Sequence, residues 1–573
     1  MRNATAGSNG GRCPPKPGGC RWAGQGGYSG RMLPFYGTKP GYPGRMPGSA
    51  LSQVRNHLNT LHKNSISLCL LAALCGCAAG PDFKRPDAPS ATGYGPAAAT
   101  QETAAAPTMH GEAQKFVSAR DIPFEWWTLF NSPQLDALIK RAFKANPDIE
   151  AAQAALRQAQ EYTAAQQGFF YPTVGVSYSP SRNKLAGNMG GNSPGQQGNG
   201  TVIQTYSNPA GPKYNGPAYY NFHIAQLTVG YVPDVFGANR RQVESAQAQT
   251  EMQQLQLEAT YITLAANVVA AAIQEASLRA QIEAQLKIVG FNRQALEIAH
   301  NQINLGYVSE MEVTQQEMNA ALAQQALVPL QQQLEQTRDL LRVLAGNTPD
   351  EDIEETFTLD QLHLPQELPL SLPSKLVEQR PDVRIAEAQL HYASAQYGVA
   401  IANTLPQFAI TGAIGGMASS PTWMFKNGGG FFDLTASVAQ TIFDGGTLRA
   451  KSRAAQQGLA QAGAQYRGVV MAALQNVADT LYVIQSDAQA LNAAATAAQA
   501  ASKMGELTRK QYEAGAVDFQ TLLMAQQNEQ LATINLVQAQ TNRLGDTAAL
   551  YQALGGGWWN HEAKNKDTAG TKQ

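Results

Sequence analysis

The chain has 573 residues, and its 42 basic and 43 acidic side chains give a net charge of −1. Residues 1–76 hold nine of the basic side chains and none of the acidic ones, so the rest of the chain is clearly acidic. An acidic body does not suit a nucleic-acid partner. Charged residues make up only 15% of the chain, below the roughly 25% of soluble domains, which argues against an ordinary cytosolic enzyme.

The first 76 residues have the composition of segments that do not fold. Residues 1–45 are rich in Gly and Pro, and we interpret them as a disordered extension of the gene upstream of the true start. Residues 46–76 resemble a signal peptide, because a basic segment precedes the apolar run 66–74. That run is too short to cross a bilayer of about 30 Å.

The cysteines indicate the compartment. Leu74, Gly76 and Cys77 resemble the lipobox of bacterial lipoproteins, which implies covalent N-acyl and S-diacylglycerol lipid on Cys77 and no other cofactor. An ordinary signal peptide with chance cysteines is the alternative. No cysteine follows Cys77, which excludes a disulfide framework or a cysteine metal site. Ala78 replaces the Asp that, by resemblance, retains lipoproteins in the inner membrane. We expect residues 77–118, rich in Ala and Pro, to form a lipid-anchored tether.

The remaining chain is a duplication. Asn146-Pro147-Asp148 returns as Arg380-Pro381-Asp382 at an offset of 234, and Gly306 returns as Gly515 at an offset of 209. The difference falls in one loop, residues 181–217, because the helical segments of the two halves have equal lengths. The expected domains are a first repeat at 119–350, a second repeat at 351–556 and a mobile tail at 557–573.

Each repeat reads as strand, loop, strand, long helix, turn and long helix. The predicted strands cover about 173–179 and 219–231 in the first repeat and about 407–414 and 431–441 in the second. In the last strand Phe432 and Leu434 alternate with Asp433 and Thr435, which is typical of a transmembrane β-barrel. A soluble antiparallel sheet alternates in the same way and stays an alternative.

The predicted long helices cover 238–304 and 447–514. They contain no Pro and almost no Gly, and at 1.5 Å per residue each extends about 100 Å. They are too long and too polar to lie in lipid. An elongated soluble coiled coil is the alternative, which the duplicated strand pairs disfavour.

Four strands cannot close a barrel, and an open sheet edge is not tolerated in hydrocarbon. The chain must therefore oligomerise if the strands span a membrane. A dimer would give eight strands with a filled interior, whereas a trimer would give twelve and leave a pore. The expected fold class is an α+β membrane protein with four β-strands and long α-helices in each internally duplicated chain.

Several ordered motifs carry a family resemblance. They are Cys77–Pro86 (CAAGPDFKRP), Trp126-Trp127, Asn146-Pro147-Asp148, Asp234–Gly237 (DVFG), Arg380–Val383 (RPDV) and Ile442–Gly446 (IFDGG). Over residues 77–556 the chain resembles the TolC-like outer-membrane efflux factors, in the NodT-type lipoprotein branch. The resemblance implies a homotrimer with a 12-stranded transmembrane β-barrel, continued by a periplasmic α-helical barrel. It also implies a periplasmic adaptor (a membrane fusion protein) and an inner-membrane pump, often of the resistance-nodulation-division (RND) type, as partners.

The helix tips are the candidate gate. Gly306 and Gly515 suit the positive φ of a helix C-cap. Glu310, Glu312 and Asp518 lie just beyond these glycines, and in a trimer they would form acidic rings that attract cations. The resemblance implies that the tips are constricted at rest and open by uncoiling of the inner helix pair. Simple solvated turn charges are the alternative.

The expected function is an efflux transporter, not an enzyme. We interpret the chain as the exit duct of a tripartite pump that exports drugs or other small toxic compounds. It would be lipid-anchored in the bacterial outer membrane, with a large periplasmic portion. The duct of a type I protein-secretion system and a non-conducting structural coiled-coil lipoprotein are the alternatives. No His-Glu-x-x-His or nucleophile-elbow motif is present, and we predict neither a metal site nor a catalytic residue. Trp126-Trp127 are expected to pack against the helical barrel.

Overall fold

The computed structural model describes residues 78–87, 93–94, 101–184, 219–426 and 428–561. The chain divides into two units, residues 1–71 and 72–573, and every element below belongs to the second unit. The expected leader, the signal peptide, Cys77 and most of the expected loop 181–217 lie outside the described residues, as does the tail from residue 562.

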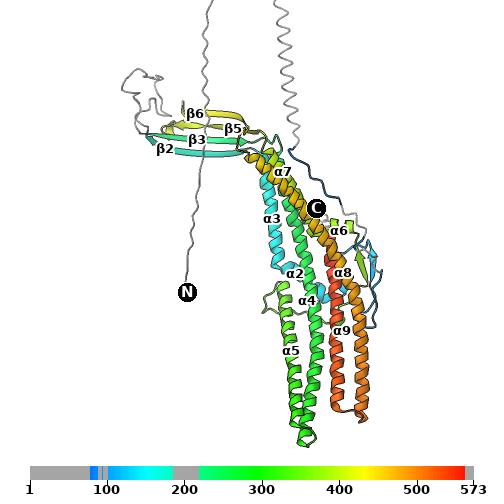
Figure 1. The fold of residues 1–573 in the computed structure, drawn as a ribbon. Helices are drawn as coiled ribbons and strands as arrows, with labels where there is room; N and C mark the ends of the chain where they lie inside the picture. Colours follow the sequence, from blue (N-terminus) through cyan, green and yellow to red (C-terminus); the bar gives the residue numbers. More distant parts are fainter. Residues whose placement is uncertain (1–77, 88–92, 95–100, 185–218, 427, 562–573) are drawn as a thin grey trace, which may run out of the picture. The chain divides into compact units, whose positions relative to one another are not determined.

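The two repeats form the same elements in the same order (Figure 1). The first repeat contains α2 (Pro133–Ala145), α3 (Pro147–Gln167), β2 (Thr173–Lys184), β3 (Tyr219–Tyr231), α4 (Ala238–Asn304) and α5 (Glu310–Leu344). The second repeat contains α6 (Pro373–Gln379), α7 (Pro381–Ala402), β5 (Gln407–Ala418), β6 (Gly430–Ala439), α8 (Thr447–Glu513) and α9 (Phe519–Ala553).

The lengths of matching elements confirm the duplication. Strands β2 and β5 both have 12 residues, α4 and α8 both have 67, and α5 and α9 both have 35. Strands β2 and β5 run several residues beyond their predicted ends, because β3 pairs with them up to Lys184 and Ala418. Strand β6 ends at Ala439, two residues early. Beyond it, the Asp444 side chain accepts the Gly446 and Leu448 N–H groups at the start of α8.

The four long strands form one antiparallel sheet in the order β2-β3-β5-β6. Figure 1 places this sheet at one end of the helices and the α4/α5 and α8/α9 turns at the other. Near the sheet α4 packs on α3 and α7, and toward the turns it packs on α5 and α9. Two shorter helices therefore follow each other along each long helix. Pro147 and Pro381 begin α3 and α7, since proline is favoured in the first helical turn.

The main core lies where the shorter helices end. The 3₁₀ segment η1 (Trp126–Phe130) is buried against α2, α4 and α9. Trp126 stacks on Tyr551 with a centroid distance of 5.4 Å, and both Trp126 and Trp127 are buried against the helices. Among the described residues one helix, α4, is long and apolar enough to cross a membrane. However, 56% of its apolar window is buried inside the protein, which identifies that window as core.

The described ends of the expected tether and tail both contact the core of the protein. Strand β1 (Lys115–Ser118) pairs in parallel with β4 (Glu367–Leu370), which fixes the end of the tether. At the other terminus, Trp558 Nε1 donates to the Gln379 carbonyl and Trp559 Nε1 donates to the Asp121 carboxylate. These anchors hold residues 557–561 on the core, because indole N–H groups beside buried rings find polar partners.

Candidate pore and gate

The sheet has one apolar face. Strand register places Val176, Leu227, Ile414 and Phe432 side by side across all four strands. Their side chains are exposed within one chain, with Val176 82% and Phe432 83% accessible. A contiguous exposed apolar face marks a surface that contacts a membrane or another protein. The register therefore supports the predicted lipid-facing side of a barrel.

The opposite face is polar and small. Here the register aligns Thr173 with Gly230, Thr411 and Thr435, and the next row aligns Gly175 with Thr228, Ala413 and Asp433. Hydroxyl groups, glycines and one carboxylate suit a water-filled lumen better than a packed core. The larger side chains on this face gather toward one end of the sheet: Ile224, Met417 and Phe431.

Aromatic and basic side chains mark the far end of the apolar face. The Tyr178 hydroxyl and His223 Nδ1 lie 2.9 Å apart, and Lys184 Nζ lies 5.4 Å from the Tyr219 ring centroid. At the end nearest the helices, Tyr171 and Phe443 are largely exposed. Aromatic girdles of this kind flank the apolar band of outer-membrane barrels at both interfaces.

The sheet has two open edges. Strands β2 and β6 each pair on one side only within the described chain. Unpaired backbone groups in hydrocarbon cost several kcal/mol each. A membrane-spanning role therefore requires each edge to pair with another chain.

The first helix tip is a closed, fully capped turn. Gly306 has a φ of +78°, its N–H donates to the Ile303 carbonyl, and the Tyr307 N–H donates to the Gln302 carbonyl. This is the Schellman arrangement, which favours glycine because it requires positive φ. Ser309 and Glu312 follow with a reciprocal capping box, in which the Glu312 carboxylate accepts the Ser309 N–H at 3.0 Å.

The second tip repeats this turn with different chemistry. Gly515 has a φ of +70°, and the Ala516 N–H donates to the Gln511 carbonyl. Asp518 is the N-cap of α9, and its carboxylate accepts the Thr521 N–H at 2.9 Å and the Thr521 hydroxyl at 2.6 Å. The hydrogen bonds from the Thr521 side chain and backbone lower the pKa of Asp518. Thr521 therefore occupies the place that Glu312 holds in the first tip.

The structure divides the predicted tip carboxylates into two kinds. Glu312 and Asp518 cap their own helices, whereas the exposed Glu310 carboxylate has no partner in the described part of the chain. The two tips meet where Gln316 Nε2 donates to Gln520 Oε1 at 2.9 Å. Sequence reasoning missed this contact, because it joins residues 204 positions apart with no motif.

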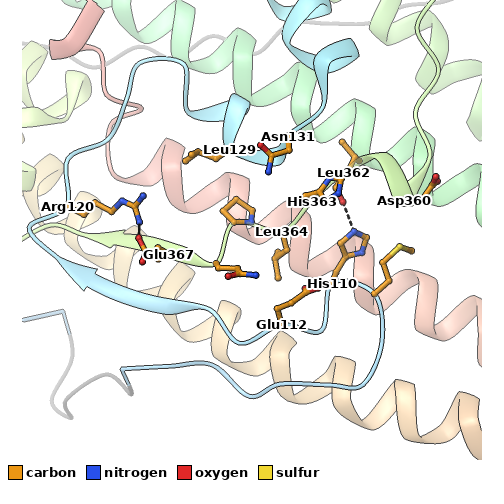
Figure 2. Close-up of a pocket in the computed structure, with 13 residues that line it drawn as sticks. His110, Glu112, Arg120, Leu129, Asn131, Asp360, Leu362, His363, Leu364 and Glu367 are labelled. Atoms are coloured by element: carbon orange, nitrogen blue, oxygen red, sulfur yellow. Dashed lines mark hydrogen bonds and ion pairs between the residues drawn. The ribbon is translucent and has the colours of Figure 1, made fainter.

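A cavity of about 520 Å³ lies away from both the sheet and the tips. Figure 2 shows His110 directed at the Leu362 carbonyl, 2.6 Å from Nε2, with the Arg120–Glu367 ion pair at the other end. Burial lowers the pKa of His110. Within the described residues, no group of three or more His, Cys, Asp or Glu side chains could hold a metal ion. None of the predicted site residues lines this cavity.

Comparison with known proteins assigns the fold. The chain is 27% identical over 496 residues to the pyoverdine export outer membrane protein OpmQ of Pseudomonas aeruginosa, covering 86% of this chain and 96% of the relative. It is 25% identical over 508 residues to the toluene efflux pump outer membrane protein TtgC of Pseudomonas putida, covering 88% and 98%.

Solved structures agree on the architecture. The Campylobacter jejuni CmeC outer membrane channel superposes with a TM-score of 0.72 at 19% identity, covering 86% of this chain and 98% of that one. The open state of the Neisseria gonorrhoeae MtrE channel superposes with a TM-score of 0.68 at 22% identity, covering 84% and 98%. The profile of the outer membrane efflux protein family matches residues 138–347 and 372–556. The chain therefore belongs to the outer membrane efflux protein family and is an outer-membrane efflux channel, not an enzyme.

Proposed function

We propose that three copies of this chain form the exit duct of a tripartite pump that exports drugs or other small toxic compounds. In this assembly the sheets close a twelve-stranded barrel, and the helices continue it as a periplasmic tube. A periplasmic adaptor and an inner-membrane pump supply the cargo. The observation that carries the proposal is a four-stranded sheet with one apolar face, one small polar face and two unpaired edges.

The helices also have two outer sides, in line with the two open edges of the sheet. In the part of each chain nearest the tips, α5 and α8 are the outer helices, because α4 and α9 lie between them. These edge helices expose apolar side chains, including Val328 on α5 and Met471 and Tyr482 on α8. Contact between the β2, α5 side of one chain and the β6, α8 side of the next would cover them. Such a head-to-tail contact gives a ring when its rotation closes after three copies.

Three chains fit the polar face better than two. Eight strands leave an interior that side chains fill, whereas larger barrels leave an aqueous channel. The lumen-facing rows consist mainly of Gly, Ala, Ser and Thr, which are too small to fill a barrel core. The small side chains therefore favour the wider, twelve-stranded assembly.

At the tips we assign the electrostatic role to Glu310. Glu312 and Asp518 stay bound in their caps, so their carboxylates primarily fix the turns. Glu310 would appear three times around the axis, and a ring of carboxylates attracts cations. Gly306 and Gly515 would let the turns stay closed while the helices above them move. A lipid on Cys77 would add a membrane anchor beside the barrel.

Single-channel recording on the purified trimer in planar bilayers tests this function. We expect an ohmic conductance with a preference for cations. Glu310→Gln should shift the reversal potential toward zero, while Glu317→Gln, on the exposed side of α5 beyond the turn, should shift it less. A purified trimer that carries no current would overturn the duct and leave the structural coiled-coil lipoprotein.

A susceptibility test separates the two kinds of cargo. Deleting the gene should lower the minimal inhibitory concentrations of several unrelated small toxic compounds and leave the set of secreted proteins unchanged. Loss of one secreted protein with unchanged susceptibility would instead indicate a type I secretion duct.

A further inference from the structure

The described chain starts with a short segment that lies on the helices beside the sheet. We call residues 78–87 the strap. The Ala79 N–H donates to the Phe236 carbonyl at 2.9 Å, in the turn between β3 and α4. This turn is at the helix-side end of the sheet, where the apolar face ends. Since Ala78 follows Cys77 directly in the sequence, the strap determines where a lipid on that cysteine could insert.

One arginine holds the strap. Arg241 lies in the first turn of α4 and is 4% exposed. Its Nε donates to the Ala79 carbonyl at 3.2 Å and its Nη2 to the Gly80 carbonyl at 3.3 Å. Nη2 also contacts the Asp82 carboxylate at 2.7 Å, and Nη1 contacts Glu244 at 2.7 Å. The planar guanidinium thus bridges backbone and carboxylate, which the single ammonium of lysine cannot reproduce.

The backbone of the strap approaches the helices at glycines. Gly80 has a φ of +89°, and a Cβ there would lie 2.6 Å from the Gly398 Cα on α7. A Cβ at Gly237, before α4, would lie 2.7 Å from the Ala78 Cα. Larger residues at these positions would push the strap off the helices. The glycines therefore allow the close approach that brings the strap carbonyls within reach of Arg241.

The far end of the strap is bound as well. Phe83 stacks on His391 of α7 with a centroid distance of 4.4 Å, and Arg85 pairs with Glu387 at 3.0 Å. The Glu244 carboxylate, which binds Arg241, also contacts His391 Nε2 at 2.8 Å. Because α4 belongs to the first repeat and α7 to the second, the strap joins both repeats at the sheet.

Electrostatics favours a fixed arginine at this point. Burial lowers the pKa of Arg241, but its hydrogen bonds and charge interactions with Glu244 and Asp82 outweigh that effect and raise the pKa. Arg241 is therefore charged at every physiological pH. Removing the partners of a buried cation strongly destabilises a protein. The contacts of Arg241 therefore favour the conformation in which the strap is bound.

We propose that Arg241 is the positioning residue that couples the lipid anchor to the barrel. It holds the strap across α4 and α7, so that the acyl chains of Cys77 enter the inner leaflet beside the end of the sheet. The anchored strap then fixes the height of the sheet while the edges β2 and β6 find their partners. This role rests on the proposed lipidation and trimer. It would explain the sequence GPDFKRP at residues 80–86 of the strap.

A double-mutant cycle tests the coupling. Arg241→Ala is compared with wild type in the natural lipoprotein and in a Cys77→Ser form exported by a cleavable, non-lipoprotein signal peptide. The readout is the fraction of chain present as assembled trimer in the outer membrane. We expect Arg241→Ala to lower that fraction about tenfold in the lipidated protein and to have little further effect in the unlipidated one. An equal loss in both backgrounds, or no loss, would overturn the proposal.

Controls separate positioning from folding and from the proposed function. Arg293→Ala removes an arginine of the same helix that contacts Gln324 and not the strap, and should leave assembly unchanged. Asp82→Asn keeps Arg241 and its contact with Glu244, and should give an intermediate loss. Trimers that still form with Arg241→Ala should conduct like wild type. A mature protein whose mass includes no acyl chains would refute the lipid anchor, whereas a trimer that carries no current would refute the duct.

Discussion

The two helical hairpins have the same backbone but different interiors. Hairpin α4/α5 contains an ion network, in which Arg279 and Arg338 donate to Glu275 Oε1 at 2.6–3.0 Å and Arg338 also contacts Asp352 at 2.7 Å. Glu275 is completely buried. The matching positions of hairpin α8/α9, at the offset of 209, are apolar or neutral and buried: Ile484, Ala488 and Thr547.

A second difference runs the other way. Hairpin α8/α9 contains a carboxyl pair, Asp487 and Asp546, where hairpin α4/α5 has Leu278 and Thr337. Burial, together with a hydrogen bond to Asp487, raises the pKa of Asp546 to about 7. Helix length and turn geometry thus stayed equal after duplication while the buried chemistry diverged. One hairpin is held together by charges, and the other contains a site that titrates near neutral pH.

The largest expected effect comes from breaking the ion network. Glu275→Ala removes the completely buried carboxylate that Arg279 and Arg338 share, while Arg338 keeps Asp352, so we expect a cost of about 3 kcal/mol, the lower end for a broken buried pair. Ile484→Val at the matching position should cost only about 1 kcal/mol. Thermal unfolding of the detergent-solubilised protein measures both, and hydrogen exchange should place the loss in α4 and α5.

A swap of interiors sharpens this comparison. The triple variant Glu275→Ile, Arg279→Ala and Arg338→Thr installs the residues of the second hairpin in the first. Replacing a buried ion network by apolar groups of suitable volume is often neutral or stabilising, so most of the loss should be recovered. A triple variant as unstable as Glu275→Ala would show that the ion network stabilises the hairpin more than apolar side chains do.

Repetition made much of this molecule predictable. Equal spacings between Gly306, Gly515 and their upstream motifs predicted helices that begin and end within a residue of the observed bounds. Strand alternation predicted the two faces of the sheet, because a side-chain period of two leaves little freedom of register. Boundaries in the strands were less accurate, since pairing with β3 extends β2 and β5 beyond their alternating segments.

The contacts outside the repeats were not predictable in the same way. The strap, the β1–β4 pair and the Trp558 anchor each join segments that lie more than 150 residues apart. Ala- and Pro-rich composition indicated an extended tether but contained no signal for its docking partner. At the tips, spacing placed Glu312 and Asp518 just beyond the turn glycines, but only hydrogen-bond geometry shows that they act as caps.

The carboxyl pair predicts a pH response confined to one hairpin. A pKa raised above the unfolded value means that the stabilisation is full below about pH 4 and is lost as pH rises through about 7. Because Asp546 is only half-buried, we expect a loss of about 2 kcal/mol, roughly half of the full linkage value. The measurement is the ratio of the hydrogen-exchange rates of α8/α9 and α4/α5 at each pH. The ratio cancels the intrinsic pH dependence of exchange, because this dependence affects both hairpins equally.

Above about pH 5, where the Asp518 cap stays formed, Asp546→Asn should make this ratio independent of pH, because the amide does not titrate. Asp479→Asn, at an exposed position of α8, should leave the pH response intact. A response between about pH 5 and pH 8 that survives Asp546→Asn would mean that another group titrates there, and the carboxyl pair would lose its role.

The smallest expected effect distinguishes the two caps. Ser309→Ala and Asp518→Ala should each cost about 1 kcal/mol at neutral pH, the usual value for a lost N-cap. Their pH dependence should differ. The pKa of Asp518 is lowered by Thr521, so its cap is fully formed above about pH 4 and is lost as pH falls through that lower value. The Ser309 hydroxyl does not titrate and still accepts the Glu312 N–H. Exchange at the second tip should therefore accelerate as pH falls through that value, and Asp518→Asn should remove this acid response while preserving the cap. Acid sensitivity of the second tip that is unchanged by Asp518→Asn would show that the lost stabilisation belongs to the helices and not to the cap.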